Sequence, residues 1–318
     1  MRILGTILVL CCIAAAAGAD QYPSRAVRVI VAAPPGGLTD IVARSVSQFL
    51  HEKYGQPFVV ENVAGASSTI GAMQVARSAP DGYTLLVNPS LFVITPMLMK
   101  TQYDVLKDFT AISNFGTVPL AIGVNPDIPS ENIQEFIALA KANPDKFTWG
   151  AEGVGSVGHL TMVRLMREGD FEILVVHYKG TSPALIDLIA GRVSAMISPV
   201  PNLIEQFRSG KVRPIAVTTK TRLTTLPNVP TLEESGFPNF EIGSWYGLWG
   251  PVGLPPNVVA TLNAGVAEAV KTPKVMDWVA QQGLIPVGSN SADFAVFQNA
   301  EIAKYQKIIT DADIKISN

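Results

Sequence analysis

The chain has 318 residues and a formal net charge of −2, and its charged fraction of 16% is well below the roughly 25% of an ordinary soluble domain. Because the net charge is slightly negative, nothing in the composition indicates a nucleic-acid partner. Hydrophobic residues make up 48% of the chain, with 26 glycines and 23 prolines. This composition favours a loop-rich α/β protein whose strands are buried on both faces.

The first 19 residues have the pattern of a cleavable secretory signal. Arg2 gives a positive start, an apolar run follows, and an Ala-Gly-Ala sequence ends at Ala19, after which cleavage is expected. A membrane anchor is the alternative, but the apolar run is shorter than the roughly 20 residues of a spanning helix. Both cysteines, Cys11 and Cys12, lie in this segment. The mature chain is therefore expected to be soluble, periplasmic and free of thiol chemistry.

Short β-rich runs alternate with helical patterns in the first part of the mature chain, which predicts parallel sheets built from βαβ units. The expected strands are 26–33, 57–61 and 83–87, and the expected helices are 40–53 and 70–78. In helix 40–53, Val42, Val46, Phe49 and Leu50 fall on one face, as in an amphipathic helix that covers a sheet.

The pattern changes near residue 120. The next expected strands are 121–124, 147–150, 173–177, 195–197 and 213–218. The helices expected between them are 130–142, 159–167 and 183–190. The final expected helices are 258–270, 273–282 and 292–311. Ser130 is the expected N-cap of its helix. The three final helices have no sheet of their own, so they are expected to pack on the first domain. We therefore expect a discontinuous first domain of residues 20–120 plus 246–318 and a second domain of residues 121–245.

Three glycine-rich loops each follow an expected strand and open a helix. They are residues 35–40, 65–71 and 153–159. A helix N-terminus presents free backbone N–H groups and a partial positive charge, so each loop could hold an anion. Ordinary strand-to-helix turns give the same pattern, and the anion-site hypothesis rests on three such loops occurring in one chain.

The third loop also has the G-x-G-x-x-G spacing of a dinucleotide site. That site needs an acidic residue at the end of the next strand, but the strand that ends at His177 has none there, so no cofactor is expected. A secreted hydrolase that uses His159 with Ser156 or Asp187 is another alternative. It lacks the G-x-S-x-G elbow, because Val154 stands two residues before Ser156. The histidines have no metal-ligand spacing, so neither a metal site nor an enzyme is expected.

Short segments spread along the chain carry a resemblance to a known family. They are Pro-Pro-Gly-Gly-Leu-Thr-Asp at 34–40, Val-Val-Glu-Asn at 59–62 leading to Gly-Ala at 71–72, Ala-Pro-Asp-Gly-Tyr-Thr-Leu at 79–85, Tyr-Asp-Val-Leu-Lys-Asp-Phe at 103–109, Gly-His-Leu at 158–160, Tyr-Lys-Gly at 178–180, Ala-Leu-Ile-Asp-Leu at 184–188 and Leu-Pro-Asn-Val-Pro-Thr-Leu at 226–232. In this order they resemble the extracytoplasmic solute receptors of tripartite tricarboxylate transporters, the Bug family.

The resemblance implies a type II periplasmic-binding-protein fold, with two α/β domains and a ligand cleft between them. In this family a ligand carboxylate is held by backbone amides and bridging waters near the first two loops, and the second domain adds its glycine loop and a following helix start. The ligand-binding residues implied for this chain are Gly37, Leu38, Thr39, Asp40, Ser67, Ser68, Thr69, Asn88, Ser90, Ser156, His159, Ser182, Ala184 and Asp187.

The function implied is that of a monomeric periplasmic receptor. It would capture a small organic carboxylate by hinge closure and deliver it to the membrane subunits of a tripartite tricarboxylate-type transporter. Delivery to a signalling sensor is the alternative, because the same closed surface could dock either partner.

Three positions depart from the family pattern. Ala33 stands where the family often has an aromatic residue, Val63 and Ala64 stand where it often has a basic residue and a proline, and His177 replaces a proline. The first two departures lie beside the ligand loops, so we expect a roomier pocket or an unusual specificity.

Overall fold

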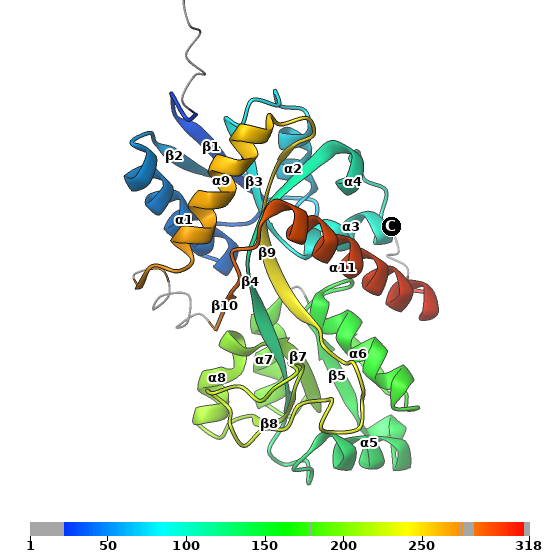
Figure 1. Cartoon of the computed structure of the whole chain (residues 1–318). Coiled ribbons are helices and arrows are strands. Elements are labelled where there is room, and N and C mark those ends of the chain that lie inside the picture. The colour runs from blue at the N-terminus through cyan, green and yellow to red at the C-terminus, as the bar shows by residue number, and fades with distance from the viewer. Residues whose placement is uncertain (1–21, 179, 274, 276–282, 315–318) are drawn as a thin grey trace, which may run out of the picture.

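The computed structural model describes residues 22–178, 180–273, 275 and 283–314. The predicted signal segment, residues 1–19, lies outside the described residues, as does nearly all of the helix expected at 273–282. Two lobes lie one above the other, and two long strands, β4 (Phe109–Val124) and β9 (Gly243–Pro251), run from one lobe into the other (Figure 1). None of the described helices is both long and apolar enough to cross a membrane.

The first lobe contains a mixed sheet with helices on both faces. Its strands lie in the order β2 (Phe58–Asn62), β1 (Val27–Val31), β3 (Thr84–Pro89), β9 and β4, with the short β10 (Ile285–Pro286) added to β4. Strand β1 pairs in parallel with β2 and β3, whereas β9 runs antiparallel to β3 and β4.

Alternation along β1 places its side chains in two cores. Val29 and Val31 pack with helices α1 (Leu38–Tyr54) and α9 (Pro256–Ala269), whereas Ile30 belongs to the core of α2 (Thr69–Ala76), α3 (Leu91–Leu98) and α11 (Ser291–Asp311). The short helix α4 (Val105–Asp108) leads into β4. Both faces of the sheet are therefore buried, as the apolar composition of its strands predicts.

The second lobe is built around the end of β4. There β7 (Ala195–Pro199) and β8 (Arg213–Val217) both pair antiparallel with β4, and β5 (Thr148–Ala151) pairs in parallel with β7 and with β6 (Leu174–His177). The helical elements of this lobe are α5 (Ile133–Ala142), the 3₁₀ turn η1 (Pro144–Lys146), α6 (Val157–Glu168), α7 (Thr181–Ile189) and α8 (Val200–Arg208). Strand β4 pairs with β9 up to Pro119 and with β7 from Leu120. The domain boundaries expected near residues 121 and 245 lie beside this crossing and stay a prediction.

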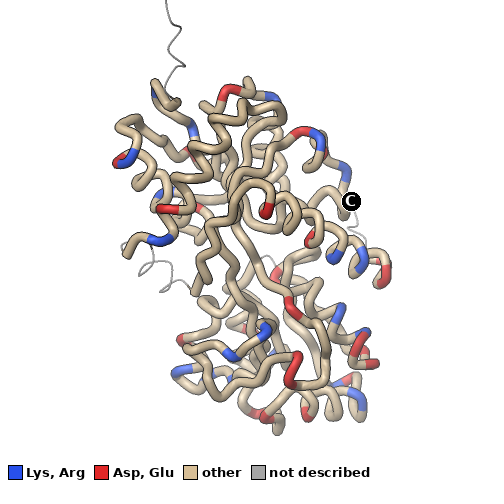
Figure 2. The backbone as a smooth tube through the Cα atoms, in the orientation of Figure 1, with Lys and Arg blue, Asp and Glu red and all other residues tan. Residues whose placement is uncertain are grey.

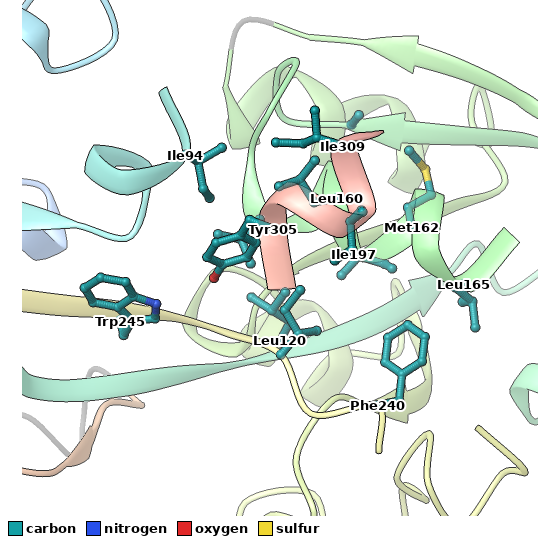
Figure 3. Close-up of a cluster of buried hydrophobic side chains, with 14 of the residues drawn as sticks. Ile94, Leu120, Leu160, Met162, Leu165, Ile197, Phe240, Trp245, Tyr305 and Ile309 are labelled. Carbon is teal, nitrogen blue, oxygen red and sulfur yellow. The ribbon is translucent and has the colours of Figure 1, made fainter. Parts of the chain in front are cut away.

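A continuous buried core joins the lobes along α11. Tyr305 and Ile309 of α11 lie in one cluster with Ile94 of α3 and with Leu160 and Leu165 of α6 (Figure 3). Helix α11 therefore packs on the first lobe, as the sequence predicts for the final helices, and also contacts α6 of the second lobe. Acidic and basic residues are interspersed along the chain in both lobes (Figure 2), and charges of mixed sign produce little long-range field of one sign.

The long strands differ most from the sequence prediction. Strand β4 begins at Phe109 and not at residue 121, because Asn114, Gly116 and Pro119 interrupt the apolar pattern that a buried strand usually shows. The structure accommodates them with register shifts against β9. The segment around Trp245 and Trp249, which was not expected to be a strand, is buried along all of β9.

Three helix predictions also need correction. Helices α3 and α8 were not expected, and α3 is apolar except for Thr95 and contains Pro96. Ser130 is not the N-cap of α5, because Asn132 Oδ1 accepts a hydrogen bond from the backbone N–H of Glu135 at 2.9 Å. The helix therefore begins at Ile133, later than expected. The hydroxyl of Ser130 is instead buried and has no partner among the described residues.

Candidate ligand-binding site

The first predicted loop is held in shape by a carboxylate of its own. Asp40, buried in the first turn of α1, accepts hydrogen bonds from Gly36 N (3.0 Å), Asn62 Nδ2 (2.9 Å) and Arg44 Nε (3.0 Å). Burial raises the pKa of the Asp40 carboxyl, but the hydrogen bonds from Arg44, Gly36 and Asn62 outweigh it and hold the pKa below its usual value. The Asp40 oxygens are thus bound by the protein itself, and Asp40 frames the loop.

The start of α1 leaves backbone donors free. Its N-cap, Gly37, supplies no side-chain acceptor, and the first N–H groups of a helix have no partner within the helix. Leu38 and Thr39 occupy these first positions. Ala33, the first departure from the family pattern, packs against the core of this face.

A left-handed turn precedes α2. Ala66, Ser67 and Ser68 have φ angles of 44°, 52° and 72°, a conformation that costs about 1–2 kcal/mol for a residue other than glycine. Thr69 closes the turn by donating from its backbone N–H (3.1 Å) and its hydroxyl (2.8 Å) to the carbonyl of Ala66, and Thr95 Oγ1 donates to the carbonyl of Ser67 (3.3 Å). Strain of this kind is concentrated at ligand sites, and α2 also starts without a side-chain cap.

The end of β3 carries a buried amide. Both polar atoms of Asn88 are buried and have no hydrogen-bond partner among the described residues. Leaving such a group unpaired costs about 1–3 kcal/mol, so Asn88 is a strong candidate for contact with a ligand or a bridging water. Ser90, which opens α3, is also fully buried, and its backbone N–H donates to the carbonyl of Trp245 at 2.8 Å.

In the second lobe, Ser156 and His159 hold the third loop. Ser156 Oγ accepts from the backbone N–H of His159 (3.1 Å), and His159 Nδ1 accepts from the N–H of Gly155 (3.1 Å). Burial, with a smaller contribution from His177, lowers the pKa of His159 to about 4. His159 is therefore neutral at pH 7, with its proton on Nε2. The exposed ring of His177 packs edge-on against it, with ring centroids 4.9 Å apart.

The predicted residues of α7 have separate environments. Gly180 precedes the helix with φ 113° and no side-chain cap, Ser182 is exposed and Ala184 is fully buried. Asp187 accepts from Tyr178 Oη (2.6 Å) and Arg192 Nε (2.8 Å), and the hydrogen bond from Arg192 is the largest cause that lowers its pKa. Like Asp40, Asp187 is held by its own lobe.

One acidic residue near the site was missed. Glu152 follows β5 directly, and its Oε1 accepts hydrogen bonds from Thr181 Oγ1 (2.8 Å) and Ser198 Oγ. Burial raises the pKa of Tyr246 on β9 to about 12, the hydrogen bond of Ser244 opposes this rise, and the Glu152 carboxylate adds to it. The only sequence signal was an acidic residue between a buried strand and a glycine loop.

The aromatic residues of β9 are divided between two environments. Trp245 and Trp249 are fully buried beneath α11, where their indole N–H groups donate to Glu301 Oε2 (3.1 Å) and Gln298 Oε1 (2.7 Å). These two side chains therefore belong to the core beneath α11. Tyr246 alternates to the opposite side of the strand and packs in the other core.

The lobes approach each other at two places away from the connecting strands. A methyl group added at Gly155 would lie 2.1 Å from Leu98 Cδ1 of α3, and one added at Gly283 would lie 2.8 Å from Pro201 Cγ of α8. The loop after β5 therefore lies against α3 of the first lobe, and the first lobe meets α8 near residue 283.

Known proteins resemble this chain along nearly its whole length. The model of the tripartite tricarboxylate transporter family receptor matches residues 42–314. Protein BugT of Bordetella pertussis is 34% identical over 99% of this chain and 98% of its own length. A solved structure of an R. palustris protein with adipate is 33% identical, with a TM-score of 0.81 over 92% of this chain and 99% of that chain. MatC from Rhodopseudomonas palustris with bound malate is 31% identical, with a TM-score of 0.76 over 91% and 100%.

The similar structures are periplasmic binding proteins with two domains. The predicted fold class and the prediction of a binding protein that is not an enzyme are therefore confirmed, and the hydrolase alternative is excluded. This chain belongs to the tripartite tricarboxylate transporter receptor family, the Bug family of periplasmic solute receptors.

Proposed function

We propose that this receptor captures a small organic carboxylate between its two lobes by hinge closure and delivers it to the membrane subunits of a tripartite tricarboxylate-type transporter. The relatives described with adipate and malate support a carboxylate as the ligand class. We propose that the receptor acts in the periplasm as a monomer, after its signal segment is cleaved following Ala19.

The pattern of helix caps is the observation that supports carboxylate binding. Helices α4, α5, α6 and α11 each begin with a side chain that accepts a backbone N–H, namely Asp104, Asn132, Ser156 and Asn290. Helices α1, α2, α3 and α7 have no such cap, and all four begin at or beside predicted ligand residues. Helices α8 and α9 are also uncapped, and α7, α8 and α9 each have a proline in the first turn, which removes one N–H group. The N–H groups at the starts of α1, α2 and α3 thus remain available to a carboxylate.

The predicted site residues then divide into two roles. We propose that the backbone of Gly37, Leu38 and Thr39, the turn before α2 and the amide of Asn88 contact the ligand. Asp40, Ser156, His159 and Asp187 would act indirectly, because their polar atoms already hold the loops. Ser182 and the start of α7 would close over the ligand from the second lobe.

Helix ends alone cannot supply the affinity of a receptor. Micromolar binding needs about 8 kcal/mol, whereas one helix end contributes roughly 0.3–1 kcal/mol when exposed and up to about 2 kcal/mol when partly buried. Hydrogen bonds to the buried Asn88 amide, bridging water and closure of the lobes would supply the remainder.

A thermal-shift screen of the mature protein tests the proposal. A ligand present at 100 times its Kd raises the free energy of unfolding by about 2.7 kcal/mol, so malate, adipate or another small organic acid should raise Tm clearly. The corresponding amides are the matched controls and should have little effect, because they lack the charge that the helix ends favour. If no carboxylate in the panel raises Tm, carboxylate capture is wrong.

Transport and signalling need a separate measurement. If the receptor serves a transporter, its ligand-bound form should bind detergent-solubilised transporter membrane subunits more tightly than its ligand-free form does. Equal, weak binding of both forms to these subunits would favour the sensor alternative, because no docking surface would then depend on the ligand.

A further inference from the structure

Glu152 places a carboxylate where the second lobe would otherwise receive a ligand anion. Its Oε1 accepts from the hydroxyl of Thr181, the first residue of α7, and from that of Ser198, which stands shortly before α8. Asn202, in the first turn of α8, also donates to the Glu152 carboxyl. The starts of α7 and α8 favour negative charge, and the protein supplies that charge from its own side chain.

The charge of the Glu152 carboxyl acts on the first lobe. Glu152 is half-buried, and its charge contributes to the raised pKa of Tyr246, which belongs to β9 of the first lobe. The loop that follows Glu152 lies against Leu98 of α3. A ligand held between the two lobes would therefore meet the Glu152 carboxyl on its second-lobe side.

Among the described residues, the groups that bind the Glu152 carboxylate carry no positive charge. In the first lobe, Asp40 forms an ion pair with Arg44 at 3.0 Å. The hydrogen-bond donors to Glu152, in contrast, are two hydroxyls and one amide, and within the described residues no Lys or Arg forms an ion pair with it. The two lobes therefore offer a ligand opposite environments, with free backbone donors on the first and an acceptor with a negative charge on the second.

We infer that Glu152 is a specificity-determining residue, which selects ligands with a carboxylate at one end and a hydrogen-bond donor, such as an ammonium or hydroxyl group, at the other. A dicarboxylate would bring a second negative charge towards Glu152, and like charges in an interface are unfavourable. An ammonium group would instead form a charge-assisted hydrogen bond. This inference rests on the proposed function, because the first lobe must hold the ligand carboxylate.

The test compares two series of ligands of equal chain length. ω-Amino acids and α,ω-dicarboxylates of about three to six carbons are titrated calorimetrically into the mature wild type, Glu152→Gln and Glu172→Gln. Glutamine keeps the acceptor for Thr181 and Ser198 but removes the charge, and Glu172 is an exposed residue of the same lobe and serves as the control. Burial raises the pKa of the Glu152 carboxyl, so the titrations are made at pH 8 to keep it ionised.

The expected result is a preference that depends on one residue. The wild type and Glu172→Gln should bind the best ω-amino acid roughly tenfold or more tightly than the dicarboxylate of the same length, and Glu152→Gln should lose this preference. A wild type that prefers dicarboxylates, or a preference that survives in Glu152→Gln, overturns the inference and leaves carboxylate capture standing. A wild type that binds neither series overturns the inference together with the proposed function.

Discussion

At the scale of single residues, Asp40 shows how a carboxylate inside an anion-binding loop can serve the loop itself. Its side chain is 5% exposed and is bound by Arg44, Asn62 and Gly36. We expect Asp40→Asn to lower the free energy of unfolding of the ligand-free protein by about 1–3 kcal/mol, because it removes the charge of a buried carboxylate and leaves donors unpaired. Urea denaturation at pH 7 measures this, with the exposed Asp127→Asn as the control.

The lowered pKa of Asp40 predicts how the stability loss in Asp40→Asn depends on pH. Because the folded-state pKa is lowered, the contribution of Asp40 is fully present above the ordinary aspartate pKa of about 3.9 and is lost as the pH falls below it. The stability difference between wild type and Asp40→Asn should therefore be the same at pH 7 and pH 6. An Asp40→Asn variant as stable as the control at both values would show that the carboxylate does not frame the loop.

His159 should make the stability of the protein depend on mildly acidic pH. Its folded-state pKa of about 4 lies below the ordinary histidine value of 6.5, so the unfolded chain binds more protons and stability falls as the pH drops from about 7 towards 4. At pH 5 the loss from this one group is about 2 kcal/mol. His159→Asn keeps an acceptor for the N–H of Gly155 but does not titrate, so it should lose less stability than wild type between pH 8 and pH 5 in urea denaturation. Parallel losses in both proteins would contradict the assignment.

At the scale of elements, the left-handed turn before α2 is a strained link between β2 and its helix. Ser67 is exposed and has φ 52°, so a substitution there tests the backbone without changing the core. Ser67→Val should lower the free energy of unfolding by about 1 kcal/mol, because a β-branched residue tolerates this region poorly. Ser67→Gly is the matched control and should not be destabilised in this way. Denaturation midpoints that fall equally for both would indicate that a side-chain contact matters more than φ.

The elements that sequence predicts well are those whose cause is local. The strands around Val29 and Leu86 are short buried runs, and the α1 pattern of Val42 and Val46 repeats at helical spacing, so the βα units of both lobes could be expected. Strand β4 could not, because Gly116 and Pro119 are acceptable in it only through its pairing with β9, more than a hundred residues later.

The same distinction applies to the candidate site. The glycine loops are visible as sequence, whereas the position of Glu152 depends on Thr181 and Ser198, which are 29 and 46 residues away. Whether a polar side chain binds a ligand or holds its own loop also depends on tertiary contacts. Asp40 and Asn88 are both polar residues that follow an expected strand. Asp40 is bound by its neighbours, whereas Asn88 has no partner among the described residues.

At the scale of the whole molecule, the proposed closure would have to act around two different connections. Strands β4 and β9 run between the lobes, while Tyr305 of α11 lies in a core shared with Leu160 of α6. Such a core resists separation, because separating α6 from α11 would expose apolar surface, which costs a free energy of about 25 cal/mol per Å². We therefore propose that the lobes rotate with the α6–α11 contact kept intact, so that the opening occurs where the loop after β5 meets α3.

The contact between Gly155 and Leu98 offers a direct test of this closure. A methyl group at Gly155 would lie 2.1 Å from Leu98 Cδ1, the end of a flexible side chain, so Gly155→Ala should displace Leu98, loosen the contact between the lobes, enlarge the radius of gyration measured by small-angle X-ray scattering with ligand, and weaken ligand binding. If the closed state becomes about 1.4 kcal/mol less favourable, affinity falls about tenfold. Adding Leu98→Ala should restore much of the affinity by removing the clash.

Backbone strain must be separated from the clash, because Gly155 has φ 78°. Gly210 provides the matched control, since it has φ 69° in the same lobe and a methyl group there would meet nothing within 4 Å. Gly210→Ala should therefore cost comparable folding stability while its ligand affinity and its scattering with ligand stay those of wild type. If Gly155→Ala and Gly210→Ala bind ligand equally well, the approach of α3 to the second lobe is not part of the closed, ligand-binding state.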